Sequence, residues 1–239
     1  MNQVKRAIIM AAGIGTRMRP ITYTIPKPLV KVNGIRMIDS VIEALYKNDI
    51  NEIYVVVGYM KEQFEILKNI YPNIKIINNP YYDSCNNISS LYVAREYLEN
   101  AMILDGDQII YNPMALSKNF ERSGYNSVWT DKITHEWLQT VENNIVVKCN
   151  RNGGKGGWQL FSVSRWTEED GKKLKKHLEI EFEQNQNRQI YWDDIAMFCY
   201  HDEYQLGIYP MKYGDIIEID SIEELITVDK SYEQVAGGL

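Results

Sequence analysis

The chain has 239 residues, a net charge of −6, and a composition that is 45% hydrophobic and 24% charged. This size and balance fit one large α/β domain with a proper core. No apolar run approaches the roughly 18 residues of a membrane span, and the start lacks a signal peptide, so we expect a cytoplasmic protein without membrane insertion. The acidic charge argues against a general nucleic-acid binder, and three widely spaced cysteines argue against a disulfide framework.

The charge is unevenly distributed along the chain. The first 38 residues contain no Asp or Glu but seven Lys or Arg residues. An acidic protein that keeps one segment cationic is a candidate for binding an anion there, although a solvated basic face has the same composition.

Hydrophobic patterns in the first half alternate between strand-like and helix-like segments. A continuously apolar strand runs into Gly13, as in a buried parallel sheet, and a loop broken by three prolines follows it. We expect further strands at 53–57, 74–77 and 101–104, and helices at 37–47, 61–70 and 89–97. This alternation predicts successive βαβ units.

The alternation decays after Asp107. We expect strands near Val128, at 146–147 and 161–163, with 153–157 as a flexible glycine turn between them. Thr167 is placed to cap a helix, and Ser221 to open a C-terminal one. We also expect a helix at 191–200 and strands at 206–209 and 216–219.

The predicted architecture is a Rossmann-like, mostly parallel mixed sheet flanked by helices, within a single domain spanning 1–239. Rossmann-like sheets commonly bind nucleotides, so we expect residues 1–110 to bind a nucleotide and residues 111–239 to bind a second substrate, called the acceptor below. The end at 236–239 is either native or a junction with a partner domain such as a kinase.

The richest motif follows the first strand, where Ala11-Ala12-Gly13-Ile14-Gly15-Thr16-Arg17 leads to Pro20, Thr22 and Pro26-Lys27-Pro28. Two glycines after a strand let backbone N–H groups approach a polyphosphate, while Arg17 and Lys27 supply charge. A dinucleotide fingerprint would need a third glycine where Met18 stands, and a Walker loop needs Gly-Lys-Ser/Thr, which is absent.

The string G-x-G-x-R-x-x-P-x-T with a following Pro-Lys closely resembles the signature of nucleotidyltransferases that include sugar-phosphate pyrophosphorylases. Within that superfamily the chain resembles the bacterial phosphocholine cytidylyltransferases of surface glycan or lipid decoration. Four further segments carry this resemblance, at 57–64, 86–91, 191–194 and 218–221. It implies that Ala12, Gly13 and Gly15 face the nucleotide, that Arg17 binds the β- and γ-phosphates, and that Lys27 stabilises charge at the reacting phosphorus.

Carboxylates for Mg²⁺ are expected at two strand ends. Asp107 follows a strand at the carboxyl edge, where ligands of open α/β sheets bind, and Asp220 lies two residues after Glu218 on one strand face. The resemblance assigns metal binding to these positions. Asp105 is interpreted as a turn former in Asp-Gly-Asp.

Base and acceptor residues are expected from two segments. Asn87 and Ser90 offer an amide and a hydroxyl to a pyrimidine edge, and the resemblance favours cytosine there, although Asn is also a common helix cap. All five tryptophans fall in the second half, and twice an aromatic residue adjoins an acid, as a cationic acceptor requires. We name Trp137, Trp192 and Asp194 as acceptor-binding candidates.

The predicted reaction is transfer of CMP from CTP to phosphocholine, with Mg²⁺ as cofactor and a fused or separate choline kinase supplying the acceptor. A phosphate monoester is already an anionic nucleophile, so no general base is required. Three alternatives stay open: the same reaction on phosphoethanolamine, an aminoalkylphosphonate or a sugar phosphate; a non-catalytic nucleotide-binding regulatory subunit; and an NAD-dependent oxidoreductase, disfavoured by Met18.

Overall fold

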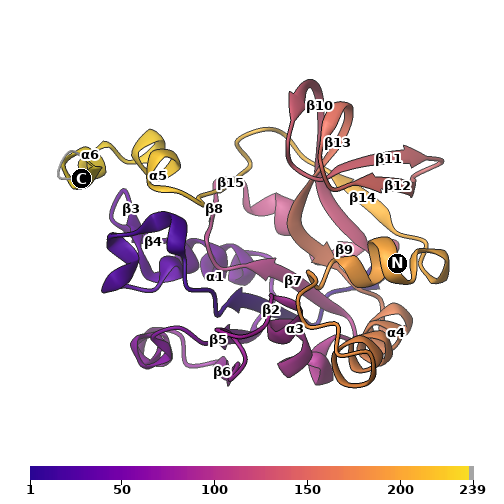
Figure 1. The fold of residues 1–239 in the computed structure, drawn as a ribbon, viewed down its shortest axis with the longest axis horizontal. Helices are drawn as coiled ribbons and strands as arrows, with labels where there is room; N and C mark the ends of the chain where they lie inside the picture. The colour runs from indigo at the N-terminus through magenta and orange to yellow at the C-terminus, as the bar shows by residue number, and fades with distance from the viewer. Residues whose placement is uncertain (237–239) are drawn as a thin grey trace.

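The computed structural model describes residues 1–236 as a mixed sheet covered by helices on both faces (Figure 1). The end considered above as a junction lies, from 237 onward, outside the described residues. Paired strands lie in the order β12-β11-β13-β7-β2-β5-β6, with β10 joining β13 to β14. Their bounds are β2 Arg6–Ala11, β5 Glu52–Val57, β6 Ile74–Asn78, β7 Ala101–Asp105, β10 Gly124–Thr134, β11 Leu138–Glu142, β12 Ile145–Asn150, β13 Gly154–Arg165 and β14 Gly207–Pro210.

Four central strands, β7, β2, β5 and β6, run parallel. Alternate residues of β2 pack into two different cores, because successive side chains of a strand point to opposite faces. Ile9 packs with α1 (Met37–Lys47), whereas Ile8 packs with α3 (Ile88–Val93) and α4 (Glu168–Glu179). Burial on both faces explains why β2, β5 and β7 are continuously apolar in sequence, whereas the edge strand β6 is only partly buried.

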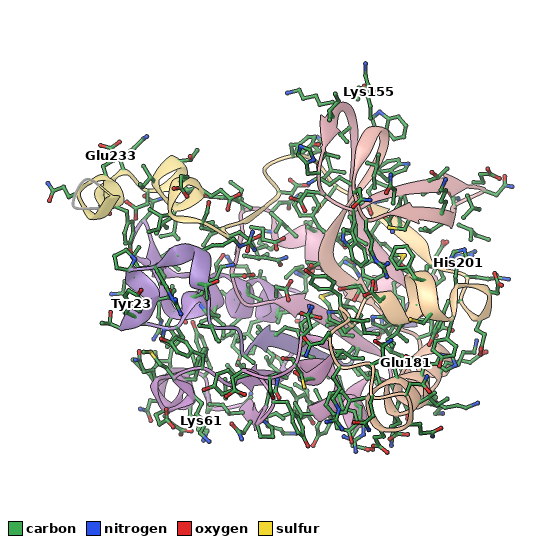
Figure 2. The ribbon with its side chains drawn as sticks, in the orientation of Figure 1. Tyr23, Lys61, Lys155, Glu181, His201 and Glu233 are labelled. Atoms are coloured by element: carbon green, nitrogen blue, oxygen red, sulfur yellow. The ribbon has the colours of Figure 1, made fainter. Side chains whose placement is uncertain are left out.

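The rest of the sheet is antiparallel. β13 pairs with β7, with Val163 opposite Leu104, so a strand from the second half continues the sheet of the first. The long β10–β13 pair projects from the parallel strands together with β11 and β12, and Lys155 lies near its outer tip (Figure 2).

Short elements complete the chain. The remaining helices are α2 Glu65–Ile70, α5 Ile222–Val228 and α6 Glu233–Ala236. Three two-stranded ladders pair β1 (Asn2–Gln3) with β9 (Asn119–Phe120), β3 (Lys31–Val32) with β4 (Ile35–Arg36), and β8 (Gln108–Ile110) with β15 (Ile216–Glu218). Within residues 1–236, no helix has the length and apolar character needed to cross a membrane.

Most predicted elements are confirmed, and four differ. The helix expected at 89–97 is α3 followed by a separate 3-10 turn at Arg95–Tyr97. Residues 61–70 form a 3-10 turn followed by α2 rather than one helix. The segment 191–200 contains only a π turn at Ile195–Cys199, since the Asp194 carboxylate accepts a bond from the backbone N–H of Tyr191 and makes a turn there. The glycine stretch is mostly strand, because β13 begins at Gly154, and a Cβ on Gly157 would lie 2.8 Å from Leu138.

Candidate functional site

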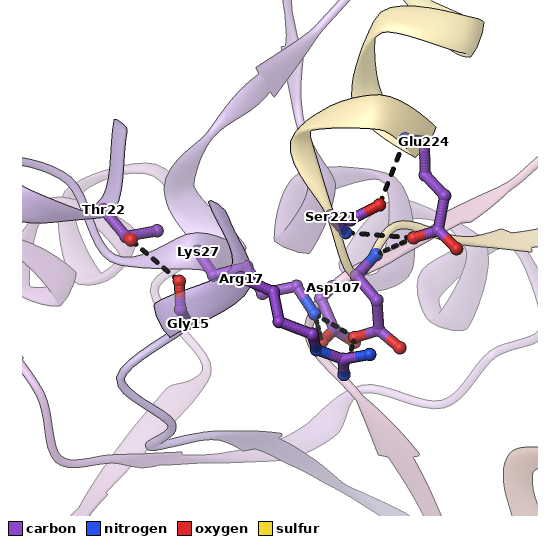
Figure 3. Close-up of polar contacts among 8 residues, drawn as sticks. Gly15, Arg17, Thr22, Lys27, Asp107, Ser221 and Glu224 are labelled. Atoms are coloured by element: carbon purple, nitrogen blue, oxygen red, sulfur yellow. Dashed lines mark hydrogen bonds and ion pairs between the residues drawn. The ribbon is translucent and has the colours of Figure 1, made fainter. Parts of the chain in front are cut away.

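The loop after β2 is shaped by Gly15 and Thr22. Gly15 has φ +67°, and a Cβ there would lie 3.1 Å from both Lys27 and Thr22 side chains, so the position favours glycine. The Thr22 hydroxyl donates to the Gly15 carbonyl at 2.8 Å (Figure 3). A Cβ on Gly13, in contrast, would have nothing within 4 Å. The loop is therefore held in place at Gly15 and has open space at Gly13, as a phosphate-binding loop requires.

Lys27 lies at the centre of the site and is 8% exposed. Its Nζ donates to Asp107 Oδ2 at 2.5 Å and to Asp220 Oδ1 at 2.6 Å, and an Arg17 nitrogen lies 3.0 Å from the same Asp220 oxygen (Figure 3). Burial opposes the charge, but the two carboxylates raise the pKa of Lys27 above its ordinary value. Burial likewise opposes the charge of Asp220, yet Lys27 and Arg17 lower its pKa. The predicted catalytic residues Lys27, Arg17 and Asp107 thus lie together.

Three carboxylates gather beside this ion pair. Oxygens of Asp105, Asp107 and Glu218 all lie within 4.8 Å of one another. Burial, reinforced by repulsion from the neighbouring acids, raises the pKa values of Asp105 and Glu218 well above the ordinary range. Asp107 Oδ1 is buried and has no hydrogen-bond partner among residues 1–236. Clustered carboxylates with an orphaned oxygen fit a divalent cation, which would offset their mutual repulsion.

The sheet explains how these acids meet. Asp105 ends β7, and the β8–β15 ladder places Glu218 opposite Gln108 while the N–H of Ile219 donates to the carbonyl of Asp107. The predicted metal set of Asp107, Glu218 and Asp220 is therefore brought to one place. Asp105, interpreted from sequence as a turn former, belongs to the cluster. Its position at the end of a buried strand, two residues before Asp107, was the signal that could have identified it.

A cavity of about 400 Å³ extends from the acids toward the second half of the chain. Asn87 and Ser90, for which nucleotide binding stays a prediction, line it from the start of α3. The Asn87 side chain does not cap α3, because its oxygen accepts from the backbone N–H of Trp192 at 2.9 Å. Ser90 accepts from Asn79 at 3.0 Å. Both side chains are therefore fixed at the wall of the cavity.

The far end of the cavity is aromatic and acidic. Trp137 and Tyr191 line it with ring centroids 5.9 Å apart in an edge-to-face arrangement, and Glu136 and Asp193 line it with them. Burial raises the pKa of Asp193 to about 7, and its Oδ1 lacks a hydrogen-bond partner in the described part of the chain. Aromatic faces beside carboxylates are the surroundings that an organic cation favours.

Two predicted acceptor residues need correction. Trp192 is 2% exposed and packs against Tyr125 and Trp166 in the core, and the buried Asp194 carboxylate pairs with the half-exposed Arg151. Their neighbours in sequence, Tyr191 and Asp193, line the cavity instead. The turn that begins at Tyr191 determines which residues of this segment line the cavity. The sequence pattern does not show where that turn begins.

Comparison with known proteins gives similarities along nearly the whole chain. A family model described as Nucleotidyl transferase matches residues 6–136. The 2-aminoethylphosphonate cytidylyltransferase of Lancefieldella rimae is 36% identical over 95% of this chain and 92% of that protein. The choline-phosphate cytidylyltransferase of Streptococcus pneumoniae is 34% identical over 92% of this chain and 94% of its own length.

Solved structures agree with the fold. That of the CTP:phosphocholine cytidylyltransferase from Streptococcus pneumoniae has a TM-score of 0.88 at 32% identity, covering 95% of this chain and 99% of that one. The inositol-1-phosphate CTP transferase from T. maritima has a TM-score of 0.76 at 20% identity, covering 98% of this chain and 96% of that one. This similarity concerns the fold only. The predicted fold class is confirmed.

Proposed function

Because the chain belongs to the nucleotidyl transferase family, we propose that it transfers CMP from CTP to phosphocholine, giving CDP-choline and pyrophosphate. The observation that carries the choice of acceptor is the aromatic and acidic end of the cavity, where Trp137 and Tyr191 adjoin Glu136 and Asp193. Relatives named for cytidyl transfer to choline phosphate and to 2-aminoethylphosphonate support a cationic, phosphorus-bearing acceptor.

The chemistry follows from the charges around Lys27. A phosphate oxygen of the acceptor attacks the α-phosphorus in line, a new P–O bond forms, and the bond to the departing pyrophosphate breaks. Lys27 and Arg17 stand at the mouth of the glycine loop, where they would offset charge on the reacting phosphorus and on the leaving group. The acceptor's second phosphate pKa is about 6, so its oxygen is anionic at neutral pH without a base.

A divalent cation would be held by Asp107 and Asp220, with Asp105 and Glu218 beside them, and would supply charge neutralisation for the triphosphate. We propose Mg²⁺ for this role, because oxygen ligands and phosphates are its preferred surroundings. Lys27 already bonds Asp107 Oδ2, so Oδ1 of Asp107, which has no partner within residues 1–236 and lies beside Asp105 and Glu218, is the oxygen left to bind the cation.

A second acceptor is favoured by one observation. The buried Asp193 carboxylate, which has the Tyr125 hydroxyl as its neighbour, could also accept a hydrogen bond from a primary ammonium group, which a quaternary ammonium cannot donate. 2-Aminoethylphosphonate and phosphoethanolamine have such a group. We favour phosphocholine because the two perpendicular rings offer more apolar surface than a primary amine requires.

The test is magnesium-dependent release of pyrophosphate. Each common nucleoside triphosphate is crossed with phosphocholine, phosphoethanolamine, 2-aminoethylphosphonate and glucose 1-phosphate. We expect release with CTP and phosphocholine, and loss of turnover by at least about a hundredfold in Asp107→Asn, since one essential charge is removed. The melting temperature of this variant checks that it is folded.

Other outcomes are informative. Preference for a primary amine would replace phosphocholine as the acceptor while keeping the reaction. Near-normal turnover of Asp107→Asn would refute the assignment of Asp107. Binding of CTP without release in any combination would favour the regulatory-subunit alternative.

A further inference from the structure

Arg151 lies behind the aromatic wall of the cavity. It belongs to the turn between β12 and β13, and its guanidinium carbon lies 3.7 Å from the ring centroid of Phe198 and 5.8 Å from that of Trp137. The Trp137 and Phe198 rings are themselves 5.4 Å apart. Arg151 therefore stacks on the Phe198 ring and lies beside the Trp137 ring, which lines the cavity.

Asp194 fixes this arginine in place. Its Oδ1 accepts from Arg151 Nε at 2.9 Å and from a terminal guanidinium nitrogen at 2.5 Å, while Oδ2 accepts from the backbone N–H of Tyr191 at 2.9 Å. The Asp194 side chain is 4% exposed, whereas that of Arg151 is 46% exposed. One carboxylate thus joins the β12–β13 turn to the backbone of a residue that lines the cavity.

The pair differs from an ordinary surface ion pair. An exposed pair contributes little, but here one partner is buried, so removing Arg151 would leave the buried Asp194 carboxylate without its compensating charge. The planar guanidinium of Arg151 donates two hydrogen bonds to Asp194 and stacks on Phe198 at the same time. A lysine ammonium would not reproduce both contacts. The contacts therefore constrain the orientation of Trp137 and Tyr191 relative to each other.

We propose that Arg151 and Asp194 are positioning residues for the acceptor, which hold Trp137 and Tyr191 at the geometry that receives a cationic head group. This inference deepens the proposed function and rests on it for the identity of the acceptor. The pair has a second effect, because Asp194 neutralises a cation that stands close to the site of another cation. Without that carboxylate, the charge of Arg151 would oppose the head group across Trp137.

The first test measures position without using activity. In protein labelled with 5-fluorotryptophan, Trp137→Phe identifies the ¹⁹F resonance of Trp137. We expect Arg151→Met to shift or broaden this resonance while that of Trp166, buried in the core, stays unchanged. The double variant Arg151→Met/Asp194→Asn removes both charges, so it gives the same readout even if the single variant folds poorly.

Arg95 offers a matched control. Its guanidinium carbon lies 4.1 Å from the Tyr92 ring centroid, and its Nε lies 3.1 Å from Glu179, so it is likewise stacked and paired, but outside the cavity. Arg95→Met should leave the Trp137 resonance unchanged.

The second test separates the two substrates. We expect Arg151→Met to raise the KM for the acceptor by about tenfold, as for loss of one ordered wall of a cation site, with the KM for CTP changed by less than about twofold. An unchanged Trp137 resonance would overturn the proposal, and so would an equal rise in both KM values. A shifted resonance in a protein that transfers CMP to none of the acceptors would support the positioning role and refute the proposed function.

Discussion

Asp193 is a buried carboxyl whose pKa lies near neutrality. It is 7% exposed, and burial raises its pKa to about 7 from the ordinary value near 4. Between about pH 4 and pH 7 the folded protein keeps the carboxyl protonated, whereas the unfolded chain has already released the proton. The ionised form therefore costs stability in the folded state, and this cost grows as the pH rises from about 4 to about 7 and is fully present above it.

Replacing Asp193 with Asn removes this titration. We expect Asp193→Asn to melt higher than the parent at about pH 8, with a much smaller difference at about pH 4, where Asp193 is protonated in the folded parent and only about half ionised in the unfolded chain. Melting curves of both proteins without substrate, recorded across this range, measure the effect. A difference that stays constant with pH would mean that Asp193 is not the group responsible.

The candidate site could be predicted from sequence where a residue's role follows from its place in a strand or motif. Asp107 and Gly15 are of this kind, since a strand end and a left-handed glycine are local features. The choice between Asp193 and Asp194 is not local. It depends on the turn at Tyr191 and on Arg151, which is 43 residues away and becomes a neighbour only when the sheet forms.

At the scale of elements, the N-terminus of α5 holds part of the site. Ser221 and Glu224 form a reciprocal cap, as the sequence predicted for Ser221, and Glu224 Oε2 also accepts from the N–H of Asp220 at 2.6 Å (Figure 3). The cap therefore fixes the backbone that carries a carboxylate of the site. Thr167 caps α4 in a similar way, but far from the glycine loop in sequence and outside the cavity.

These two caps make a matched pair. Glu224→Ala and Thr167→Ala should each cost about 1 kcal/mol, or about 2–4 °C in melting temperature for a protein of this size. Only Glu224→Ala should also lower turnover, since it releases Asp220, and Glu224→Gln should restore most of it. Equal turnover in the two alanine variants would show that the Glu224 cap does not affect the reaction through Asp220.

Elements were predicted best where burial determines the pattern. The helix at 37–47 has the bounds of α1, and the buried parallel strands were recognised from their continuous apolar runs. The glycine stretch misled the prediction, because it combines two uses of glycine within one strand: Gly157 leaves space for Leu138, whereas Gly156 has φ +74° and open space around it. Sequence alone does not distinguish these two uses.

At the scale of the molecule, the β7–β13 ladder makes the two halves share one sheet. Arg165, 2% exposed on β13, adds bonds to the carbonyls of Ala115 and Ser117 and to Asn126. Burial without a neighbouring acid lowers the pKa of this arginine to about 10. The division into halves near residue 110 stays a prediction about function, whereas the contacts favour unfolding as one unit.

Cooperative unfolding is testable because all five tryptophans lie in the second half. Thermal or urea unfolding followed by tryptophan fluorescence reports that half, and far-ultraviolet circular dichroism reports the whole chain. We expect the two midpoints to coincide, since separating β13 from β7 would expose the edge of the central sheet. A fluorescence midpoint well below the dichroism midpoint would show that the halves unfold separately.

The crowding of acids around Lys27 also determines which form of a nucleotide is admitted. The side chains that meet there are four carboxylates and two cations: Asp105, Asp107, Glu218 and Asp220 against Lys27 and Arg17. Without a bound cation, the raised pKa values of Asp105 and Glu218 keep these two acids protonated, and Lys27 and Arg17 balance the charges of Asp107 and Asp220. A triphosphate that brings its own counter-cation would let all four acids ionise around that cation, whereas a bare triphosphate would meet only uncharged acids and satisfied ion pairs. We therefore expect excess free nucleotide to compete poorly with the cation-bound form.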